Sequence, residues 1–290
     1  MNSKWLWPSI IAVLLIAIWL YLPPGIDPVA VPADSDSIAR GEYLVKAGGC
    51  ISCHEGSEGE GGLSGSAAVE SPFGTFYASN ITPDPETGIG NWSGEDFIAA
   101  LRHGRRPDGS FYYPAFPYRA YKGLSEEEIL DIAAYLQSQP AISHSVAPHE
   151  LPAWVGRWQM LGWNLLADWK EPGREMNDDP EIARGEHLVR NLGHCSECHS
   201  PRDALGIIQY RDEFKGGEIP DGHVEAIDAE ALNSWTEEDL ALFFLIGMKQ
   251  DGEFVGGKME PVIEHNTSQL TDADREAMAA FFKRGLPASP

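Results

Sequence analysis

The chain has few cysteines and few basic residues for its length. Only four of its 290 residues are cysteine, and 21 Lys and Arg stand against 44 Asp and Glu, so the formal net charge is −23. A surface this acidic would repel nucleic acid and anionic membranes, and it either keeps the chain soluble or favours a partner with a basic docking face. Because the chain exceeds the usual size of one domain, two domains are expected.

Long apolar runs are also scarce, with one exception near the N-terminus. Residues 5–22 carry no charge and predict an N-terminal transmembrane helix, with residues 1–4 as a cytoplasmic tail. A cleaved signal peptide is the alternative, but its cleavage site should lie close behind the apolar core, whereas the best site here follows Ala33. Both alternatives place the rest of the chain outside the cytoplasm, and we predict a single-pass inner-membrane protein whose main part lies in the periplasm.

The four cysteines form two C-x-x-C pairs, and a histidine follows each pair directly. The strings CISCH at 50–54 and CSECH at 195–199 are the attachment signature of c-type haem. The two thiols can each form a thioether with the porphyrin, and the adjacent imidazole then reaches the iron. We therefore predict two covalently bound haem c groups. The predicted attachment residues are Cys50, Cys53, Cys195 and Cys198, and the predicted iron ligands are His54 and His199.

Other uses of a C-x-x-C pair fit less well. Tetrahedral zinc needs four ligands that converge on one ion, whereas the two pairs stand in separate copies of a repeat. A thioredoxin-like redox motif belongs in a βαβ setting, which the helical pattern of this chain does not provide.

An internal repeat extends far beyond the two haem strings. The matching blocks are 39–54 with 183–199, 91–111 with 234–254, and 124–136 with 270–282. Three matching blocks in the same order indicate duplication. Helix starts recur in both copies, each an N-cap residue with an acidic residue three positions later. These pairs are Ser93 with Asp96, Thr236 with Asp239, Ser125 with Glu128, and Thr271 with Asp274, and the predicted helix stops are Gly104, Gly247 and Gly285.

These patterns predict an all-α fold with two tandem haem domains. The predicted segments are a linker at 23–36, domain 1 at 37–140, a Trp-rich helical linker at 141–178 and domain 2 at 179–290. Within the second linker, apolar residues recur every three or four positions and predict an amphipathic helix. They are Trp154, Trp158, Leu161, Leu165 and Trp169. We expect this face to pack across the interface of the two domains, with a membrane-surface or partner-docking helix as the alternative.

The sixth iron ligand is usually Met or His, and Met raises the potential. For the second haem we predict Met259, because it lies in the loop GGKMEPV between two helices, whereas Met248 and Met278 fit the core.

The first haem lacks an equivalent methionine. Aligning DGEFVGGKM with DGSFYYPAF puts Phe116 at the ligand position, and there is no methionine between His54 and Met160. The first haem therefore has an open sixth position or takes a ligand from elsewhere. The candidates are His103, Lys122, His144, His149 and Met160, with Met160 and the two linker histidines ahead.

Several blocks resemble the cytochrome c subunits of bacterial membrane-associated alcohol, gluconate, fructose and aldehyde dehydrogenases. They include FGTFYASNITPDPETGIGNWS, PDGSFYYPAFPYRAY and LVRNLGHCSECHSPRDALG, and the likeness covers nearly all of residues 37–288. The resemblance implies two class I cytochrome c domains that take electrons from a periplasmic dehydrogenase and hand them to quinone, another cytochrome or an oxidase. Many such subunits have three haem domains, and relatives often carry a methionine in or just after the segment that matches YPAFPYRAYKGL. Here that segment offers Phe116 and Leu124.

Two classes of function remain in view. An electron-transfer subunit without independent catalysis is favoured. The alternative is a catalytic dihaem cytochrome, a peroxidase or an enzyme oxidising sulfur compounds, whose first haem is open or unusually ligated. Sulfur-oxidising enzymes use an extra cysteine ligand, and all four cysteines here are used for attachment. A haem-based sensor would need a signalling module, and the sequence has none visible.

Overall fold

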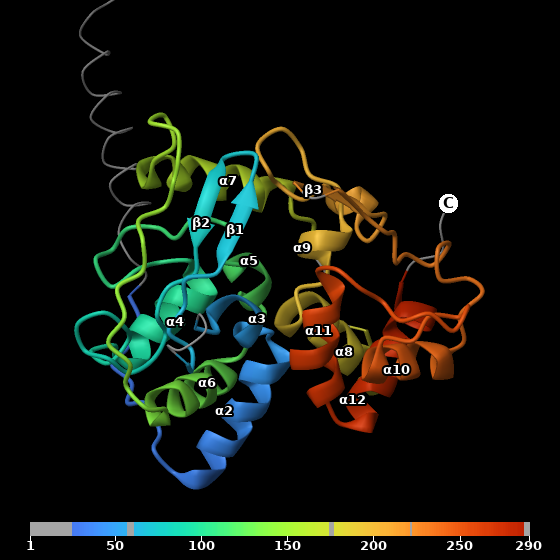
Figure 1. Cartoon of the computed structure of the whole chain (residues 1–290), viewed down its shortest axis with the longest axis horizontal. Helices are drawn as coiled ribbons and strands as arrows, with labels where there is room; N and C mark the ends of the chain where they lie inside the picture. The colour runs from blue at the N-terminus through green and yellow to red at the C-terminus, as the bar shows by residue number, and fades with distance from the viewer. Residues whose placement is uncertain (1–24, 57–60, 174–176, 221, 287–290) are drawn as a thin grey trace, which may run out of the picture.

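The computed structural model describes residues 25–56, 61–173, 177–220 and 222–286, and it contains two helical units that lie side by side (Figure 1). The first unit begins with a long helix, carries the first haem string on the next short helix, and ends with a second long helix. Its elements are α2 (Ser35–Ala47), α3 (Cys50–His54), β1 (Ala68–Ser71), β2 (Gly74–Tyr77), α4 (Gly94–His103), α5 (Tyr118–Tyr121) and α6 (Glu126–Ser138).

The linker and the second unit follow. The linker carries the 3-10 turn η2 (Arg157–Gln159) and α7 (Met160–Lys170). The second unit repeats the order of the first, with a π-helical turn at the end of its first and last helices. Its elements are α8 (Pro180–Glu186), η3 (His187–Leu192), α9 (Ser196–His199), η4 (Tyr210–Asp212), β3 (Gly217–Ile219), β4 (Gly222–Val224), α10 (Glu237–Ile246), α11 (Met259–His265), η5 (Thr267–Gln269), α12 (Asp272–Ala280) and η6 (Phe281–Gly285).

In both units the first and last helices cross at a glycine. A Cβ atom on Gly41 of α2 would overlap the carbonyl oxygen of Asp131 in α6, and one on Gly185 of α8 would overlap that of Ala277 in α12. Glycine is needed at both crossings because the two backbones touch. The crossings bury an apolar core in each unit, centred on residues such as Ile129 and Phe281.

The helix ends follow their predicted signals. Ser93, Ser125 and Thr236 each accept a hydrogen bond from the backbone N–H three residues on, in reciprocal capping boxes. Gly104 and Gly247 end α4 and α10 in the left-handed conformation that glycine adopts readily.

The all-α prediction is wrong. Each unit has a short antiparallel hairpin between its haem string and its next long helix, formed by β1 with β2 and by β3 with β4. The strands have only three or four residues, which is too short for an alternating pattern to stand out in the sequence. The predicted transmembrane helix is not supported either: no helix in the described parts of the chain is long and apolar enough to cross a membrane, and residues 5–22 lie outside those parts.

The Trp-rich linker packs with the opposite face from the one expected. In and before α7 the buried side chains are Met160 and Ala167, whereas Trp154, Trp158 and Trp169 are 62, 75 and 80% exposed. Leu165 is exposed as well. The predicted burial of this apolar face between the two units is therefore wrong for these four residues, and only Leu161 of the face is half-buried.

Candidate haem-attachment site

Two short helices present the four cysteines in the same way. In each string the first cysteine, Cys50 or Cys195, is half-buried and the second, Cys53 or Cys198, is exposed, and none of the four forms a disulfide. Burial raises the pKa of the Cys50 and Cys195 thiols to about 12. The two thiols of each string are thus free of disulfides and spaced along one helical turn, as attachment to a porphyrin edge requires.

The two histidines are oriented by backbone carbonyls. Nδ1 of His54 lies 2.7 Å from the carbonyl oxygen of Ser79, and Nδ1 of His199 lies 2.7 Å from that of Glu225. A carbonyl only accepts, so each Nδ1 carries the proton and Nε2 keeps its lone pair for a metal. Burial lowers the pKa of both imidazoles, which favours the same neutral form. The residues present fit a covalently attached, histidine-ligated haem.

The two strings lie against each other across the units. The Tyr121 hydroxyl donates to the carbonyl oxygen of Gly48 (3.0 Å), two residues before the first string. The Tyr121 ring in turn packs edge-on against His194, which directly precedes Cys195, with 5.7 Å between centroids. Burial is the main cause that raises the pKa of Cys198, and the Cys53 thiol is near enough to add to this rise. The Tyr121 side chain therefore lies between the two strings.

A reciprocal pair of polar contacts holds the units in this arrangement. His187 Nε2 donates to Glu128 Oε1 (2.8 Å), and the Tyr43 hydroxyl donates to Asp274 Oδ2 (2.5 Å). Tyr43 and His187 occupy the same position of the repeat, and so do Glu128 and Asp274. Each unit therefore reaches the acidic residue at the start of the other unit's last helix, as a two-fold related pair would.

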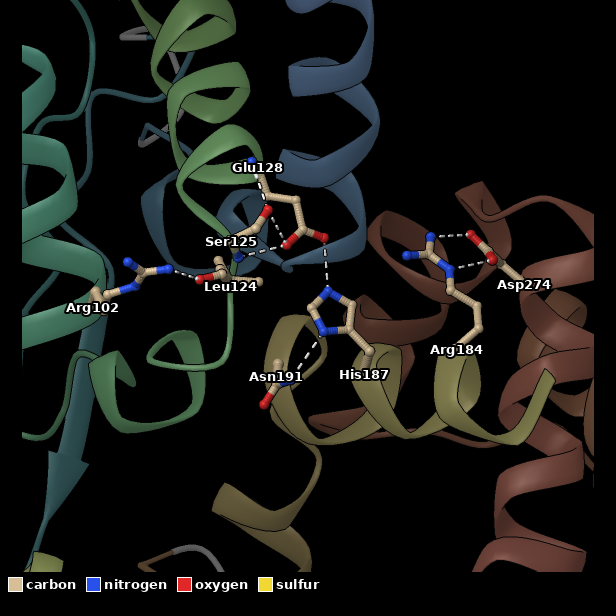
Figure 2. Close-up of polar contacts among 8 residues, drawn as sticks. All are labelled: Arg102, Leu124, Ser125, Glu128, Arg184, His187, Asn191 and Asp274. Carbon is tan, nitrogen blue, oxygen red and sulfur yellow. Dashed lines mark hydrogen bonds and ion pairs between the residues drawn. The ribbon is translucent and has the colours of Figure 1, made fainter. Parts of the chain in front are cut away.

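Figure 2 shows the hydrogen bonds that surround the contact between His187 and Glu128. Glu128 accepts from His187 with one oxygen and from the Ser125 backbone N–H with the other (2.8 Å), while the Asn191 amide donates to the second nitrogen of His187 (3.0 Å). In the same view Arg184 donates to both oxygens of Asp274 (2.8 Å each). Burial alone would raise the pKa of Glu128, but the His187 and Ser125 hydrogen bonds outweigh it and lower this pKa to about 2.

Known proteins share this sequence over most of its length. Residues 38–140 match the family model for cytochrome c. Over 285 residues the chain is 39% identical to a dihaem c-type cytochrome from Cereibacter sphaeroides, covering 94% of this chain and 96% of that protein. The chain belongs to the cytochrome c family.

Longer relatives of this cytochrome include named subunits of dehydrogenases. It is 36% identical to the cytochrome c subunit of a quinone alcohol dehydrogenase from Gluconobacter oxydans, and 35% identical to the gluconate 2-dehydrogenase cytochrome c subunit from Pantoea cypripedii. The matches cover 90 and 87% of this chain but only 57 and 60% of those subunits. The resemblance to cytochrome subunits of dehydrogenases is confirmed.

The zinc alternative finds no support in this cytochrome. Within the ranges that the structure describes, no group of three or more His, Cys, Asp and Glu side chains could hold a metal ion.

Met259 begins α11 and is half-buried. Its neighbour Lys258 is close enough to Cys198 to lower the pKa of that thiol slightly, against the larger effect of burial. α11 also packs against α3, and the Asn266 side chain after it lies 3.2 Å from the place where a Cβ of Gly49 would be. The segment around Met259 thus adjoins both haem strings. Met259 as a ligand remains a prediction.

In the first unit of the cytochrome, Phe116 stands at the position equivalent to Met259. Its ring packs among three tyrosines, Tyr112, Tyr118 and Tyr121, with centroid distances of 5.1, 6.4 and 5.7 Å. An aromatic cluster therefore occupies the position that aligns with Met259, and a sixth ligand of the first haem would have to come from another residue.

The five candidate ligands of the first haem are dispersed. His144 Nε2 is hydrogen-bonded to Ser66 Oγ (2.7 Å), and His149 Nδ1 accepts from the Tyr77 backbone N–H (3.1 Å). Lys122 is paired with Asp168 (3.3 Å) in the linker. His103 ends α4, where burial and the nearby cations lower its pKa, and Met160 is buried at the start of α7.

Sequence reasoning missed Tyr121 and His194, the two rings between the strings. His194 was visible as the residue before Cys195, but nothing in its sequence position shows that it faces the other unit. The polar pairs between units could have been found, because the repeat alignment puts a hydrogen-bond donor at 43 and 187 and an acid at 128 and 274.

Proposed function

We propose that this chain is a dihaem electron-transfer protein that takes electrons from a dehydrogenase and passes them to an acceptor of the respiratory chain. It carries two covalently bound haem c groups. Cys50, Cys53, Cys195 and Cys198 attach them, His54 and His199 bind the irons, and Met259 completes the second site.

The observation that carries this proposal is the contact between the two strings. Tyr121 and His194 bridge them, through the Tyr121 hydrogen bond to Gly48 and the packing of the two rings. Bound haem supplies one-electron chemistry at each string. The protein's own part is to hold the two attachment points together through the two polar pairs at Glu128 and Asp274, so that transfer needs no motion of one unit relative to the other.

The partner and the location rest on other support. A dehydrogenase donor is proposed because longer relatives are named as cytochrome subunits of such enzymes. A periplasmic location for the haem units is proposed from the uncharged N-terminal stretch at residues 5–22, which is typical of exported chains. Fractionation of the producing cells would find the haem units in the periplasmic or membrane fraction under this proposal, and in the cytosol if it is wrong.

An electron count tests the proposed function. Stepwise reduction of the haem-loaded protein, followed by visible absorbance, should take up two electrons per chain. The double variant Cys195→Ser/Cys198→Ser should take up one electron. Its intact mass should be lower than that of the unaltered chain by one haem, in addition to the small difference between two cysteines and two serines. Uptake of one electron by the unaltered chain would contradict the dihaem proposal.

A second candidate is a catalytic dihaem cytochrome whose first haem is open. The specific observation in its favour is Phe116, which occupies the ligand position within the cluster of tyrosines. Turnover of hydrogen peroxide by the reduced protein, at a rate well above that of free haem, would support it.

A further inference from the structure

The Ser79 carbonyl that orients His54 has the backbone of a glycine packed against it. Gly65 donates its N–H to the carbonyl oxygen of His54 (2.9 Å), and a Cβ atom on Gly65 would lie 2.6 Å from both the carbonyl carbon and the carbonyl oxygen of Ser79. With φ at 87°, Gly65 is also in a conformation that favours glycine. The Ser79 carbonyl is thus enclosed on this side.

The residue after this carbonyl, Asn80, is 3% exposed and uses both ends of its amide. Its oxygen accepts from the backbone N–H of Thr82 (2.9 Å) and from the Thr82 hydroxyl (2.7 Å). Its nitrogen donates to the carbonyl oxygen of Ile142 (2.8 Å) and to Thr87 Oγ1 (3.1 Å). Because the Ser79 carbonyl and the Asn80 N–H belong to one planar peptide group, an anchored Asn80 fixes the direction of that carbonyl.

The same two threonines bind a segment that runs back along the first unit after α6. We call this segment, residues 142–150, the linker strap. The backbone N–H of Ile142 donates to Thr82 Oγ1 (3.1 Å), and that of His144 donates to Thr87 Oγ1 (3.0 Å). The start of the linker strap is therefore bound to the loop that follows the orienting carbonyl.

The other end of the linker strap binds the hairpin that leads to this carbonyl. His149 Nδ1 accepts from the Tyr77 backbone N–H (3.1 Å), and Glu150 exchanges two backbone hydrogen bonds with Thr75 (2.9 and 3.0 Å). These bonds place β2 between β1 and the linker strap. The linker strap thus binds residues that precede Ser79 and residues that follow it.

The second unit has an equivalent carbonyl with a different residue after it. The Glu225 carbonyl orients His199, and Gly216 donates its N–H to the carbonyl oxygen of His199 (2.9 Å) with φ at 86°, as the glycine of the first unit does. The next residue is Ala226, whose methyl group has no atom that forms a hydrogen bond. Asn80 and Ala226 are therefore equivalent positions, and Asn80 alone can bind a neighbouring segment through its side chain.

This support affects the chemistry of an iron that His54 binds. A carbonyl that accepts from Nδ1–H raises the basicity of the imidazole, and a more basic ligand favours ferric over ferrous iron. A Ser79 carbonyl that could rotate would form a weaker hydrogen bond on average. His54 would then be less basic, and the first haem would be reduced more easily.

We propose that Asn80 and the linker strap are positioning elements for the first haem, which hold the Ser79 carbonyl on His54 and so lower the reduction potential of the first iron. This inference rests on the proposed function and deepens it. The linker then has a role in tuning one of the two sites, in addition to joining the two units.

The experiment measures the reduction potentials of the full haem-loaded chain from visible absorbance during stepwise reduction. Asn80→Ala gives the first unit the residue that the second unit has at this position. We expect one potential to rise and the other to stay unchanged, because a weaker bond to Ser79 makes His54 less basic. The same substitution in the Cys195→Ser/Cys198→Ser chain, which keeps only the first haem, should show the same rise and so assign it to that haem.

Asn91→Ala is the matched control. Asn91 lies in the same loop and also donates from its amide to a backbone carbonyl, that of Pro85 (2.7 Å), but this carbonyl belongs to the loop itself and not to the linker strap. Its substitution should leave both potentials unchanged. No shift in Asn80→Ala, a shift to lower potential, or an equal shift in both variants would overturn the proposal.

A milder variant decides the question if Asn80→Ala does not load its first haem. Thr87→Val keeps the shape of the side chain and removes the oxygen that binds Asn80 and the His144 N–H, so it should raise the same potential by a smaller amount. An unchanged potential in Thr87→Val would then contradict the proposal. Loss of the first haem in both variants would do so too, since the network would be needed for attachment and not for tuning.

Intact mass separates this inference from the proposed function. An unaltered chain that does not hold two haems would overturn the proposed function. Two haems whose potentials respond to neither Asn80→Ala nor Thr87→Val would overturn the inference alone.

Discussion

At the residue scale, Glu128 has two roles, and each role uses one of its two carboxylate oxygens. One carboxylate oxygen accepts from Ser125 N–H and Oγ and so caps α6, and the other accepts from His187 of the second unit. The capping hydrogen bonds already order the Glu128 side chain within its own unit. Less side-chain entropy is therefore lost when Glu128 binds His187 of the second unit. A residue that the sequence marks only as a helix cap thus also joins the two halves of the molecule.

This double role predicts how stability depends on pH. The pKa of Glu128 in the folded chain is about 2, below its ordinary value of 4.5, so its contribution is fully present above about pH 4.5 and is lost as pH falls toward 2. Allowing for solvent screening of a partly exposed pair, this contribution is about 2 kcal/mol. Glu128→Gln should lower the free energy of unfolding by that amount at pH 7 and flatten its fall between pH 4.5 and 2, as measured by denaturant titration.

Glu127→Gln is the control for this prediction. Glu127 lies in the same helical turn but is exposed, so its substitution should leave both the stability and its pH profile within about 0.5 kcal/mol. Equal effects of the two substitutions would mean that the charge of the helix, and not the contact with His187, sets the pH dependence of the free energy of unfolding.

At the scale of elements, the crossing of the first and last helices of each unit depends on a glycine, which has no side chain. Gly41 and Gly185 let α2 touch α6 and α8 touch α12 backbone to backbone, and the apolar residues on either side of each crossing form the two cores. The strings that follow α2 and α8 are positioned by these crossings, because each string begins within eleven residues of its glycine.

A pair of glycine substitutions tests the crossing. Gly41→Ala should lower the free energy of unfolding by about 3 kcal/mol, because the new methyl group would force α2 and α6 apart. Gly162→Ala in α7 meets no atom within 4 Å and should raise stability by about 0.5 to 1 kcal/mol, since alanine favours a helix. Chemical denaturation followed by circular dichroism measures both, and a similar small change in the two variants would contradict the crossing as described.

Some elements were predictable from sequence and others were not, for physical reasons. The helix starts at Ser93, Ser125 and Thr236 could be predicted from the sequence because a capping box depends on residues within four positions of each other. Periodicity predicted that Trp158 and Trp169 share a helix face, whereas Trp158 lies in the 3-10 turn before α7. Periodicity also contains no information on whether a face is covered, and the expected burial was wrong. The haem strings were identifiable because their spacing is set by the porphyrin itself, whereas Tyr121 gains its role only when the two units meet.

At the scale of the whole molecule, duplication explains both the likeness of the two units and their differences. The two polar contacts between them, at Glu128 and at Asp274, use equivalent positions, as in a dimer of two identical chains. The linker breaks this symmetry, because it contacts different places on the two units: Arg157 binds the Phe111 carbonyl in the first, and Trp163 binds the Leu205 carbonyl in the second. The two sites also differ in the residue at the ligand position, Phe116 in one and Met259 in the other. Each unit is thus a version of the same site with a different residue at the position predicted for the sixth ligand.

The measurement that tests this account most directly is low-temperature electron paramagnetic resonance of the fully oxidised, haem-loaded protein. An electron-transfer protein with six-coordinate irons should show two low-spin ferric signals per chain. Met259→Ala should change one of them and leave the other intact, because a methionine ligand would be lost from one site only. Met248→Ala, which removes a methionine of the same unit from the turn before α11, should change neither. A high-spin signal in the unaltered chain that shifts on addition of cyanide, or a Met259→Ala spectrum identical to that of the unaltered chain, would contradict the account.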